Sequence, residues 1–576
     1  MSDDPKSLLD QMKRALGDKE DMFEDAEKER YQRFYHIHNY LLSLIYISKQ
    51  LLQGLRDLDR DPNLKANNKF IGNITIYFNI IIINMIMFLK DWLASNGVWV
   101  QSKSSWGKAP HPLVISSNTE DDGESCGRGL LARESLTEGE LMMTIPFDIC
   151  LTRAAAREIF GPAIIPDYMD EYISIALLLM NERLIGTKSN WKPYLDVLPT
   201  KEDVNPSFVW TDGELEGLKG SPVYVASKFL NQKVKKEYDD LKETIFKRYP
   251  NIFPQEKFTY ELFEWAFVML FSRAARLSSK SGGEELALVP YADLMNHNPY
   301  SNTYIDAQKQ GIPLISKEEE VAVYSDRSYR KFEQVFINYG EKSNADLLLL
   351  YGFALERNPF NSIDIVVGLS KDDPLYNQKK AYLDRQGRGE ASVRFPLQQD
   401  RYPSELVDFL RLLLVEPEDL GLQTIANVDF NEPISPSLER RVLSTMISIC
   451  ETYLEQYPST VQEDEILIKD RKMFDLLTRQ QRMAVKLRAS EKRILLSTIT
   501  AVKDELLRLP AVVNVGEEIL PAGRSFDTMG PRVPLSLNNY KSLVEDRDAK
   551  KKELEEAAKQ KEGSSSIAER RRRRRG

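Results

Sequence analysis

Leu288-Val-Pro-Tyr-Ala-Asp-Leu-Met-Asn-His-Asn-Pro299 is the most informative stretch of this sequence, and Ile337-Asn338-Tyr339-Gly340 is its later counterpart. An apolar run changes within the first stretch to the polar side chains of Asp293, Asn296 and His297. Because buried polar groups must find hydrogen-bond partners, this change predicts a site at the end of a strand or helix. For this segment alone, an Asx-type turn with a satisfied core histidine is the alternative.

A glycine turn precedes these two stretches. Gly127, Arg128 and Gly129 lead into a predicted strand, and the turn residues 136–140 then lead into a second strand at 141–146, which predicts a hairpin. The two glycines could let the backbone approach a ligand closely, or they could simply serve the turn. The GxG pattern alone does not decide between these interpretations.

Helical periodicity surrounds the strands. Apolar residues at helical spacing predict a core helix over Tyr172 to Arg183 and another over Phe263 to Leu277. Arg273 and Arg276 lie at the end of the second helix, where they could meet a ligand carboxylate. Basic residues in the last turn are also favoured by the helix dipole and need no ligand. Residues 363–369 predict a last strand, and residues 370–510 predict only helices.

Composition limits the class of protein. A chain of 576 residues is too long for one core, so two or three domains are expected. A net charge of −9 argues against nucleic-acid binding but leaves room for a basic peptide substrate. The chain has three cysteines, which are far apart and predict neither a disulfide framework nor a metal site. A reducing compartment is expected, and the acidic start shows no signal or transit peptide.

Residues 70–89 carry no charge and have about the length of a membrane-spanning helix. Asn73, Asn79 and Asn84 would each be costly in hydrocarbon, and the flanking charges indicate no orientation. A buried helix or strand, or residues read through by a faulty gene model, are the alternatives. The six arginines Arg570 to Arg575 predict a nuclear-import or anionic-surface patch, or a solvated tail.

Three signals stand together in order: the glycine turn, the Asp293-x-x-Asn296-His297 segment, and Asn338-Tyr339-Gly340 followed by residues 343–353. In this set the chain resembles the SET-domain methyltransferases, in the branch typified by the Rubisco large-subunit lysine methyltransferase. The stretches 457–460, 463–465 and 481–485 are similar to the signature of that branch's second domain. The similarity covers about residues 88 to 510.

The resemblance implies an α+β fold: a SET-domain β-fold of short strands with a pseudoknot and a helical insert at about 200–285, followed by an all-α substrate-binding domain. The implied domains are a helical, charged extension at 1–87, the SET domain at 88–369, the substrate-binding domain at 370–510 and a partly disordered tail at 511–576.

The resemblance also implies the site. The residues implied to contact S-adenosylmethionine are Gly127, Arg128, Gly129, Arg273, Asn296, His297 and Tyr339. Arg273 would face the carboxylate of the cofactor. Tyr339 would be the catalytic residue, at the point of methyl transfer. The target side chain would be lined by Arg276, Asp293 and Tyr351. Cys126 stands where the plant enzymes have an acidic residue, and Arg128 replaces an apolar one. No metal is implied.

The expected activity is that of a protein-lysine N-methyltransferase using S-adenosylmethionine. Two alternatives remain: a protein-histidine N-methyltransferase of the same fold, because a related branch acts on actin, and an inactive SET-like module that binds a protein. The expected partner is a protein that carries the target lysine, with no nucleic acid, and the chain is expected to be a monomer. An intracellular location is expected, in the cytoplasm, nucleus or plastid.

Overall fold

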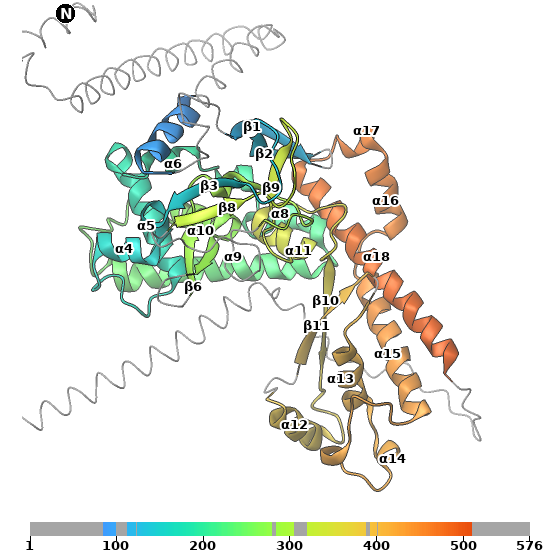
Figure 1. Cartoon of the computed structure of the whole chain (residues 1–576). Coiled ribbons are helices and arrows are strands. Elements are labelled where there is room, and N and C mark those ends of the chain that lie inside the picture. Colours follow the sequence, from blue (N-terminus) through green and yellow to red (C-terminus); the bar gives the residue numbers. More distant parts are fainter. Residues whose placement is uncertain are drawn as a thin grey trace, which may run out of the picture. The chain divides into compact units, whose positions relative to one another are not determined.

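The computed structural model describes residues 84–98, 112–121, 124–278, 284–303, 320–387, 392–399 and 401–509. The chain divides into the units Met1–Met87 and Phe88–Gly576, and the helices and strands labelled in Figure 1 lie in the second. Most of the extension at 1–87, the tail at 511–576 and the arginine run lie outside the described residues.

Only the end of the apolar stretch 70–89 is described. Residues 84–95 form a helix in which Leu89 and Leu93 are completely buried. Among the residues that the structure describes, no helix combines the length and apolar character needed to cross a bilayer.

A four-stranded sheet carries the residues around which the site is built. β1 (Leu113–Asp121) and β2 (Glu124–Ala132) pair antiparallel, β2 pairs with β9 (Gln334–Ile337), and β9 pairs in parallel with β7 (Asn296–His297). The register of β1 and β2 shifts around Thr119, opposite Gly127, whose φ is 71°. Glycine adopts this conformation without steric cost, and such a shift is a β-bulge. The predicted glycine turn is therefore a bulge inside β2.

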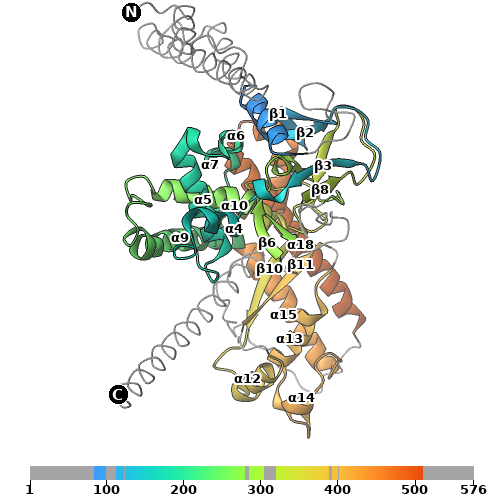
Figure 2. The same cartoon turned by 60° about the vertical axis from the view of Figure 1, so that its left-hand side comes forward.

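Two smaller sheets lie in the same part of the chain. β3 (Leu141–Pro146) pairs with β8 (Glu320–Tyr324) (Figures 1 and 2). In the other sheet, β6 (Glu284–Leu288) lies between β4 (Leu151–Thr152) and β5 (Ala275–Ser278). The hairpin predicted at 136–146 is wrong, because β2 and β3 belong to different sheets. The turn at 136–140 is a corner whose backbone bonds to residues 325 and 329, far along the chain.

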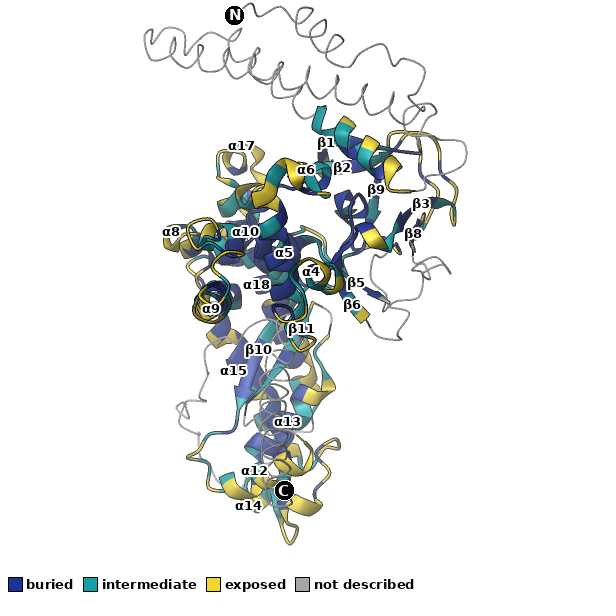
Figure 3. Cartoon of the chain, turned by 90° about the vertical axis from the view of Figure 1, so that its left-hand side faces the viewer, coloured by how far each residue is buried: buried dark blue, intermediate teal, exposed yellow. Residues whose placement is uncertain are grey.

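Helices separate β4 from β5. They begin earlier than the expected insert and are α4 (Arg153–Phe160), α5 (Glu171–Ile185), α6 (Lys192–Val197), α7 (Lys201–Val204), α8 (Asp212–Leu215), α9 (Pro222–Leu241) and α10 (Tyr260–Arg273). The predicted core helix at Tyr172 to Arg183 is confirmed as α5, which is mostly buried, like α10 (Figure 3). Side-chain caps explain the starts of α5 at Asp170, of α9 at Ser221 and of α10 at Thr259. The helix predicted to reach Leu277 ends at Arg273, and Arg276 lies on β5.

The second part of the chain, from about residue 370 to residue 509, is mainly helical, as expected. Its helices are α12 (Tyr376–Arg385), α13 (Ser404–Leu414), α14 (Pro417–Leu420), α15 (Pro436–Glu455), α16 (Val461–Lys469), α17 (Arg471–Phe474) and α18 (Arg479–Arg508). It is not exclusively helical, because β11 (Ser392–Gln398) pairs antiparallel with β10 (Ser362–Gly368). Pro396 is compatible with this strand, because a two-stranded sheet has only edge strands, and edge strands tolerate proline.

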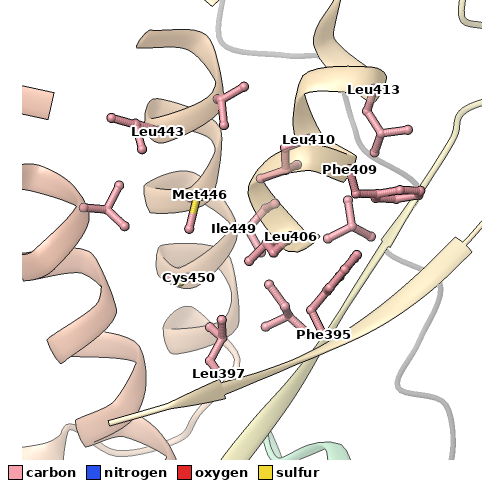
Figure 4. Close-up of a cluster of buried hydrophobic side chains, with 14 of the residues drawn as sticks. Phe395, Leu397, Leu406, Phe409, Leu410, Leu413, Leu443, Met446, Ile449 and Cys450 are labelled. Carbon is pink, nitrogen blue, oxygen red and sulfur yellow. The ribbon is translucent and has the colours of Figure 1, made fainter. Parts of the chain in front are cut away.

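One hydrophobic core joins this small sheet to the helices. Phe395 and Leu397 of β11 pack with Leu406 and Phe409 of α13 and with Met446 of α15 (Figure 4). Strand β10, predicted as the last strand of the first domain, contributes its alternating apolar residues to the same core. The domain boundary at residue 369 stays a prediction.

Candidate active site

Two segments distant in sequence meet at the centre of the site. Asn296 and His297 of β7 lie beside Phe336 and Ile337 of β9 in parallel register. Beyond the strands, the Asn338 side-chain amide donates to the carbonyls of residues 299 and 301, at 3.2 Å in both cases. The short strands therefore hold the two stretches singled out in the sequence side by side. The predicted pseudoknot stays a prediction, because residues 304–319 between them lie outside the described residues.

Aromatic rings gather around Tyr339. Its ring stacks with His297 at a centroid distance of 5.0 Å and with Tyr351 at 5.0 Å, with interplanar angles of 24° and 23°. Phe353 lies 6.1 Å from the His297 ring and 6.3 Å from the Tyr351 ring. Tyr351 ends the π-helical turn η9 (Leu347–Tyr351), and π-turns are frequent at functional sites. The structure thus brings Tyr339, His297 and Tyr351 together, as the resemblance implied.

Backbone groups orient the Tyr339 phenol and the His297 ring. The Tyr339 hydroxyl donates to the Met295 carbonyl at 2.9 Å, and the Tyr339 backbone N–H donates to Nδ1 of His297 at 3.1 Å. Since Nδ1 accepts, the ring proton of a neutral His297 lies on Nε2. That nitrogen is buried and has no hydrogen-bond partner among the described residues. It is therefore a donor that fits an acceptor on a bound molecule.

Burial keeps both groups uncharged at neutral pH. It raises the pKa of the Tyr339 phenol far above its ordinary value, so the phenol keeps its proton. It lowers the pKa of His297 to about 4, so the imidazole is neutral. Tyr339 is therefore suited to orient a reacting group and unsuited to remove a proton as a phenolate.

Asn296 fastens the glycine bulge. The two N–H groups of its side-chain amide are shared among three acceptors, which are Thr119 Oγ1 at 3.0 Å, the Arg128 carbonyl at 3.1 Å and Gln334 Oε1 at 2.9 Å. A Cβ on Gly129 would lie 2.7 Å from that nitrogen. A Cβ on Gly127 would meet no described atom within 4 Å. Gly129 therefore permits a close approach, whereas Gly127 serves the backbone conformation.

A second polar group lies just before β7. Asp293, in the turn η8 (Ala292–Leu294), accepts a hydrogen bond from the Tyr194 hydroxyl at 2.7 Å. Arg273 Nη1 donates to the Asp293 carbonyl at 2.8 Å and lies 3.5 Å from its carboxylate. Burial raises the pKa of Asp293, which the neighbouring Arg273 opposes. Arg273 Nε and Asp293 Oδ1 are buried and have no hydrogen-bond partner among the described residues, so they can accept a ligand that carries both charges.

Arg276 has a partner of opposite charge within the protein. Its guanidinium forms an ion pair with Glu171 of α5 at 2.7 Å, and the other oxygen of Glu171 accepts from the Leu286 backbone at 3.1 Å. The pair joins β5 and β6 to α5. The ion pair with Glu171 gives this guanidinium a partner inside the protein. The expected role of Arg276 toward a substrate stays a prediction.

Some residues of the site had no signal in the sequence. Tyr194, Thr119 and Gln334 act through contacts with residues far along the chain, which no local spacing reveals. Phe353 closes the stretch 343–353, so its aromatic character was the only available signal. Tyr291, buried before η8 at a φ of 76°, is held in a conformation that non-glycine residues rarely adopt.

Known families match both parts of the chain. The SET-domain family matches residues 127–340, and the Rubisco LSMT substrate-binding family matches residues 370–495. The chloroplastic fructose-bisphosphate aldolase-lysine N-methyltransferase of Arabidopsis thaliana is 30% identical over 427 residues, covering 73% of this chain and 83% of that protein. The chloroplastic Rubisco large-subunit N-methyltransferase of Nicotiana tabacum is 29% identical, covering 68% and 79%. The actin-histidine N-methyltransferase of Canis lupus familiaris is 27% identical, covering 73% and 72%.

Solved structures show the same fold. The SET domain of LSMT bound to lysine and AdoHcy superposes with a TM-score of 0.61 at 25% identity, covering 74% of this chain and 92% of that one. The structure of Rubisco LSMT bound to AdoMet has a TM-score of 0.59 at 24% identity, covering 74% and 93%.

Proposed function

This chain belongs to the SET-domain protein methyltransferases that carry a Rubisco LSMT substrate-binding domain, and from that premise we propose that it is an S-adenosylmethionine-dependent protein-lysine N-methyltransferase. The observation that carries the proposal is the stack of His297, Tyr339 and Tyr351 with a protonated phenol at its centre. The substrate is a protein that presents a lysine side chain to these rings.

The cofactor's polar groups have matching residues. Three buried atoms have no hydrogen-bond partner within the described part of the chain. Arg273 Nε suits a carboxylate, Asp293 Oδ1 suits an ammonium group, and His297 Nε2–H suits an acceptor nitrogen or oxygen. The bulge Gly127–Gly129, fastened by Asn296, supplies backbone groups beside them. When bound, S-adenosylmethionine supplies the electrophilic methyl group.

The aromatic rings prepare and align the lysine. A lysine amine must be neutral to attack, and an apolar aromatic channel lowers its pKa by desolvating the ammonium form. The Tyr339 hydroxyl proton is engaged by the Met295 carbonyl, which leaves the oxygen lone pairs to orient groups at the reacting centre. Holding the reactants in line can supply much of the acceleration. The ring faces also attract a methylated ammonium through cation–π interaction.

Tyr339→Phe tests this assignment. Loss of the hydroxyl is expected to lower methyl transfer by about 10²-fold, the usual effect of removing one group that acts on the transition state. The rings stay stacked, so cofactor binding should be nearly unchanged. Incorporation of labelled methyl groups into a cell extract measures the first quantity, and calorimetric titration measures the second.

Tyr329→Phe is the matched control. Tyr329 is a buried tyrosine whose hydroxyl donates to Asp326 at 2.6 Å, outside the site described above. This variant should keep the wild-type rate. Equal rates for Tyr339→Phe and wild type would contradict the proposed role of the phenol.

Mass spectrometry of the labelled acceptor distinguishes the remaining alternatives. A labelled lysine supports the proposal, whereas a labelled histidine would assign the activity of the actin-histidine relatives. Cofactor binding without any transfer would indicate a protein-binding module. We further propose an intracellular location, because Cys126, Cys150 and Cys450 are free thiols.

A further inference from the structure

Helix α18 belongs to the second part of the chain, but its first turns reach the site. Its later residues Ile494, Leu495 and Val502 pack in the core formed with α13 and α15. Figures 1 and 2 show the helix running from beside α15 toward the strands of the first part. The helix begins at Thr478, whose side chain accepts from the backbone N–H of Gln481 and fixes the helix start.

Arg479 bridges the backbone of α7 and the backbone between the Tyr351 and Phe353 rings. Its guanidinium donates to the carbonyl of Asp203 in α7 at 2.6 Å and to the carbonyl of Gly352 at 3.5 Å. Gly352 is the residue between Tyr351 and Phe353. Arg479 therefore holds the segment that carries these two rings against the C-terminus of α7.

Met483 holds the same segment one helical turn later. The backbone N–H of Ala354 donates to Met483 Sδ at 3.3 Å, and both residues are buried. Residues i and i+4 lie on one face of a helix, so Arg479 and Met483 contact the segment together. The two contacts flank Phe353, which they hold on both sides.

The adjacent face of α18 holds the strand that carries the glycine bulge. Arg482 Nη2 lies 3.2 Å and Lys486 Nζ lies 3.1 Å from the carboxylate of Glu124 at the start of β2. The Lys486 side chain is only 3% exposed. Because low exposure weakens screening by solvent, this pairing constrains the strand more than a surface ion pair would.

We propose that the first turns of α18 are a positioning element of the active site, in which Arg479 and Met483 set the spacing of the Tyr351 and Phe353 rings. The inference rests on the proposed function and deepens it. Arg479 and Met483 are positioning residues that act through Gly352 and Ala354. Helix α18 thus contributes to the spacing of the rings around Tyr339, and a change in that spacing changes the room for methyl groups on a lysine nitrogen held between them.

Hydrogen exchange tests the structural half without any need for activity. In Arg479→Ala, amides in residues 347–355 should exchange about tenfold faster or more, because hydrogen bonds from a charged donor are lost. Arg493→Ala is the matched control, since Arg493 lies on the same helix but pairs with Glu465 of α16 at 2.7 Å. Unchanged exchange in Arg479→Ala, or an equal increase in Arg493→Ala, would overturn the proposal.

Product analysis tests the functional half. Arg479→Ala should alter the ratio of mono-, di- and trimethyllysine and lower kcat more than it raises KM for the cofactor. Arg479→Lys, which keeps one charged donor, should restore part of the wild-type ratio. A wild-type ratio in Arg479→Ala would refute the positioning role. If wild type transfers no methyl group at all, the proposed function fails, and the exchange experiment still decides the inference about α18.

Discussion

Replacing Gly129 by alanine tests whether close packing holds the glycine bulge. The backbone of Gly129 is outside the left-handed region, so alanine is conformationally allowed and the effect is steric. Its Cβ would lie 2.7 Å from Asn296 Nδ2 and 2.8 Å from Gln334 Oε1. Ordinary contact begins at 3.4 Å, so these atoms must move away by several tenths of an ångström.

The expected cost follows from these contacts. Overpacking in a well-packed region costs about 1–3 kcal/mol. The Asn296 hydrogen bonds, now 2.9–3.1 Å long, would stretch, and each lost bond adds about 1 kcal/mol. We expect the free energy of unfolding to fall by about 3 kcal/mol. Displacement of the bulge should also weaken cofactor binding about tenfold or more, which corresponds to about 1.4 kcal/mol.

Gly127→Ala is the control for this prediction. Gly127 has a φ of 71° and open space around its Cβ position, so alanine there costs only about 1–2 kcal/mol of backbone strain. Urea unfolding and calorimetric titration with S-adenosylhomocysteine measure both variants. The packing argument is refuted if Gly129→Ala is as stable as wild type and binds the ligand equally well.

Two further predictions follow from single residues. Gly352→Ala places a Cβ 2.0 Å from the Val204 carbonyl at a φ of 78°. Urea unfolding should therefore show that the free energy of unfolding falls by more than about 3 kcal/mol. A variant as stable as wild type would contradict the contact between the end of η9 and α7. Burial lowers the pKa of His297 from 6.5 to about 4. Between those pH values the unfolded chain binds a proton at this histidine and the folded chain does not, so the free energy of unfolding should fall by about 3 kcal/mol as the pH drops. Urea unfolding at pH 4 and pH 7 measures this difference. His297→Gln should lack the part of the difference that comes from this histidine.

Local patterns predicted a large part of the fold. Helical spacing identified α5. The strand predicted at 363–369 is β10. These predictions succeeded because burial of one face depends on neighbours a few residues away.

Predictions failed where a distant partner decides. The strand β11 exists because β10 lies beside it, and the corner at 136–140 pairs with residues near Tyr329 rather than with β2. Arg276 was expected at a helix end, but it lies on β5 and forms an ion pair with Glu171 of α5, 105 residues away. Its role toward a substrate stays a prediction. Sequence spacing contains no record of such partners.

The sequence by itself determined the family, through the order of the glycine pair, the Asn296-His297 pair and Tyr339. It also determined which residue types are available for chemistry, because side-chain identity needs no fold. Only the tertiary structure decided which contacts each one makes: Asn296 Nδ2 bonds to the glycine bulge, His297 Nε2 is buried with no partner among the described residues, and Arg479 bonds to the Gly352 carbonyl. The physical reason is that hydrogen bonds and ring contacts act over a few ångströms in space, and the folded topology alone sets which distant residues come that close.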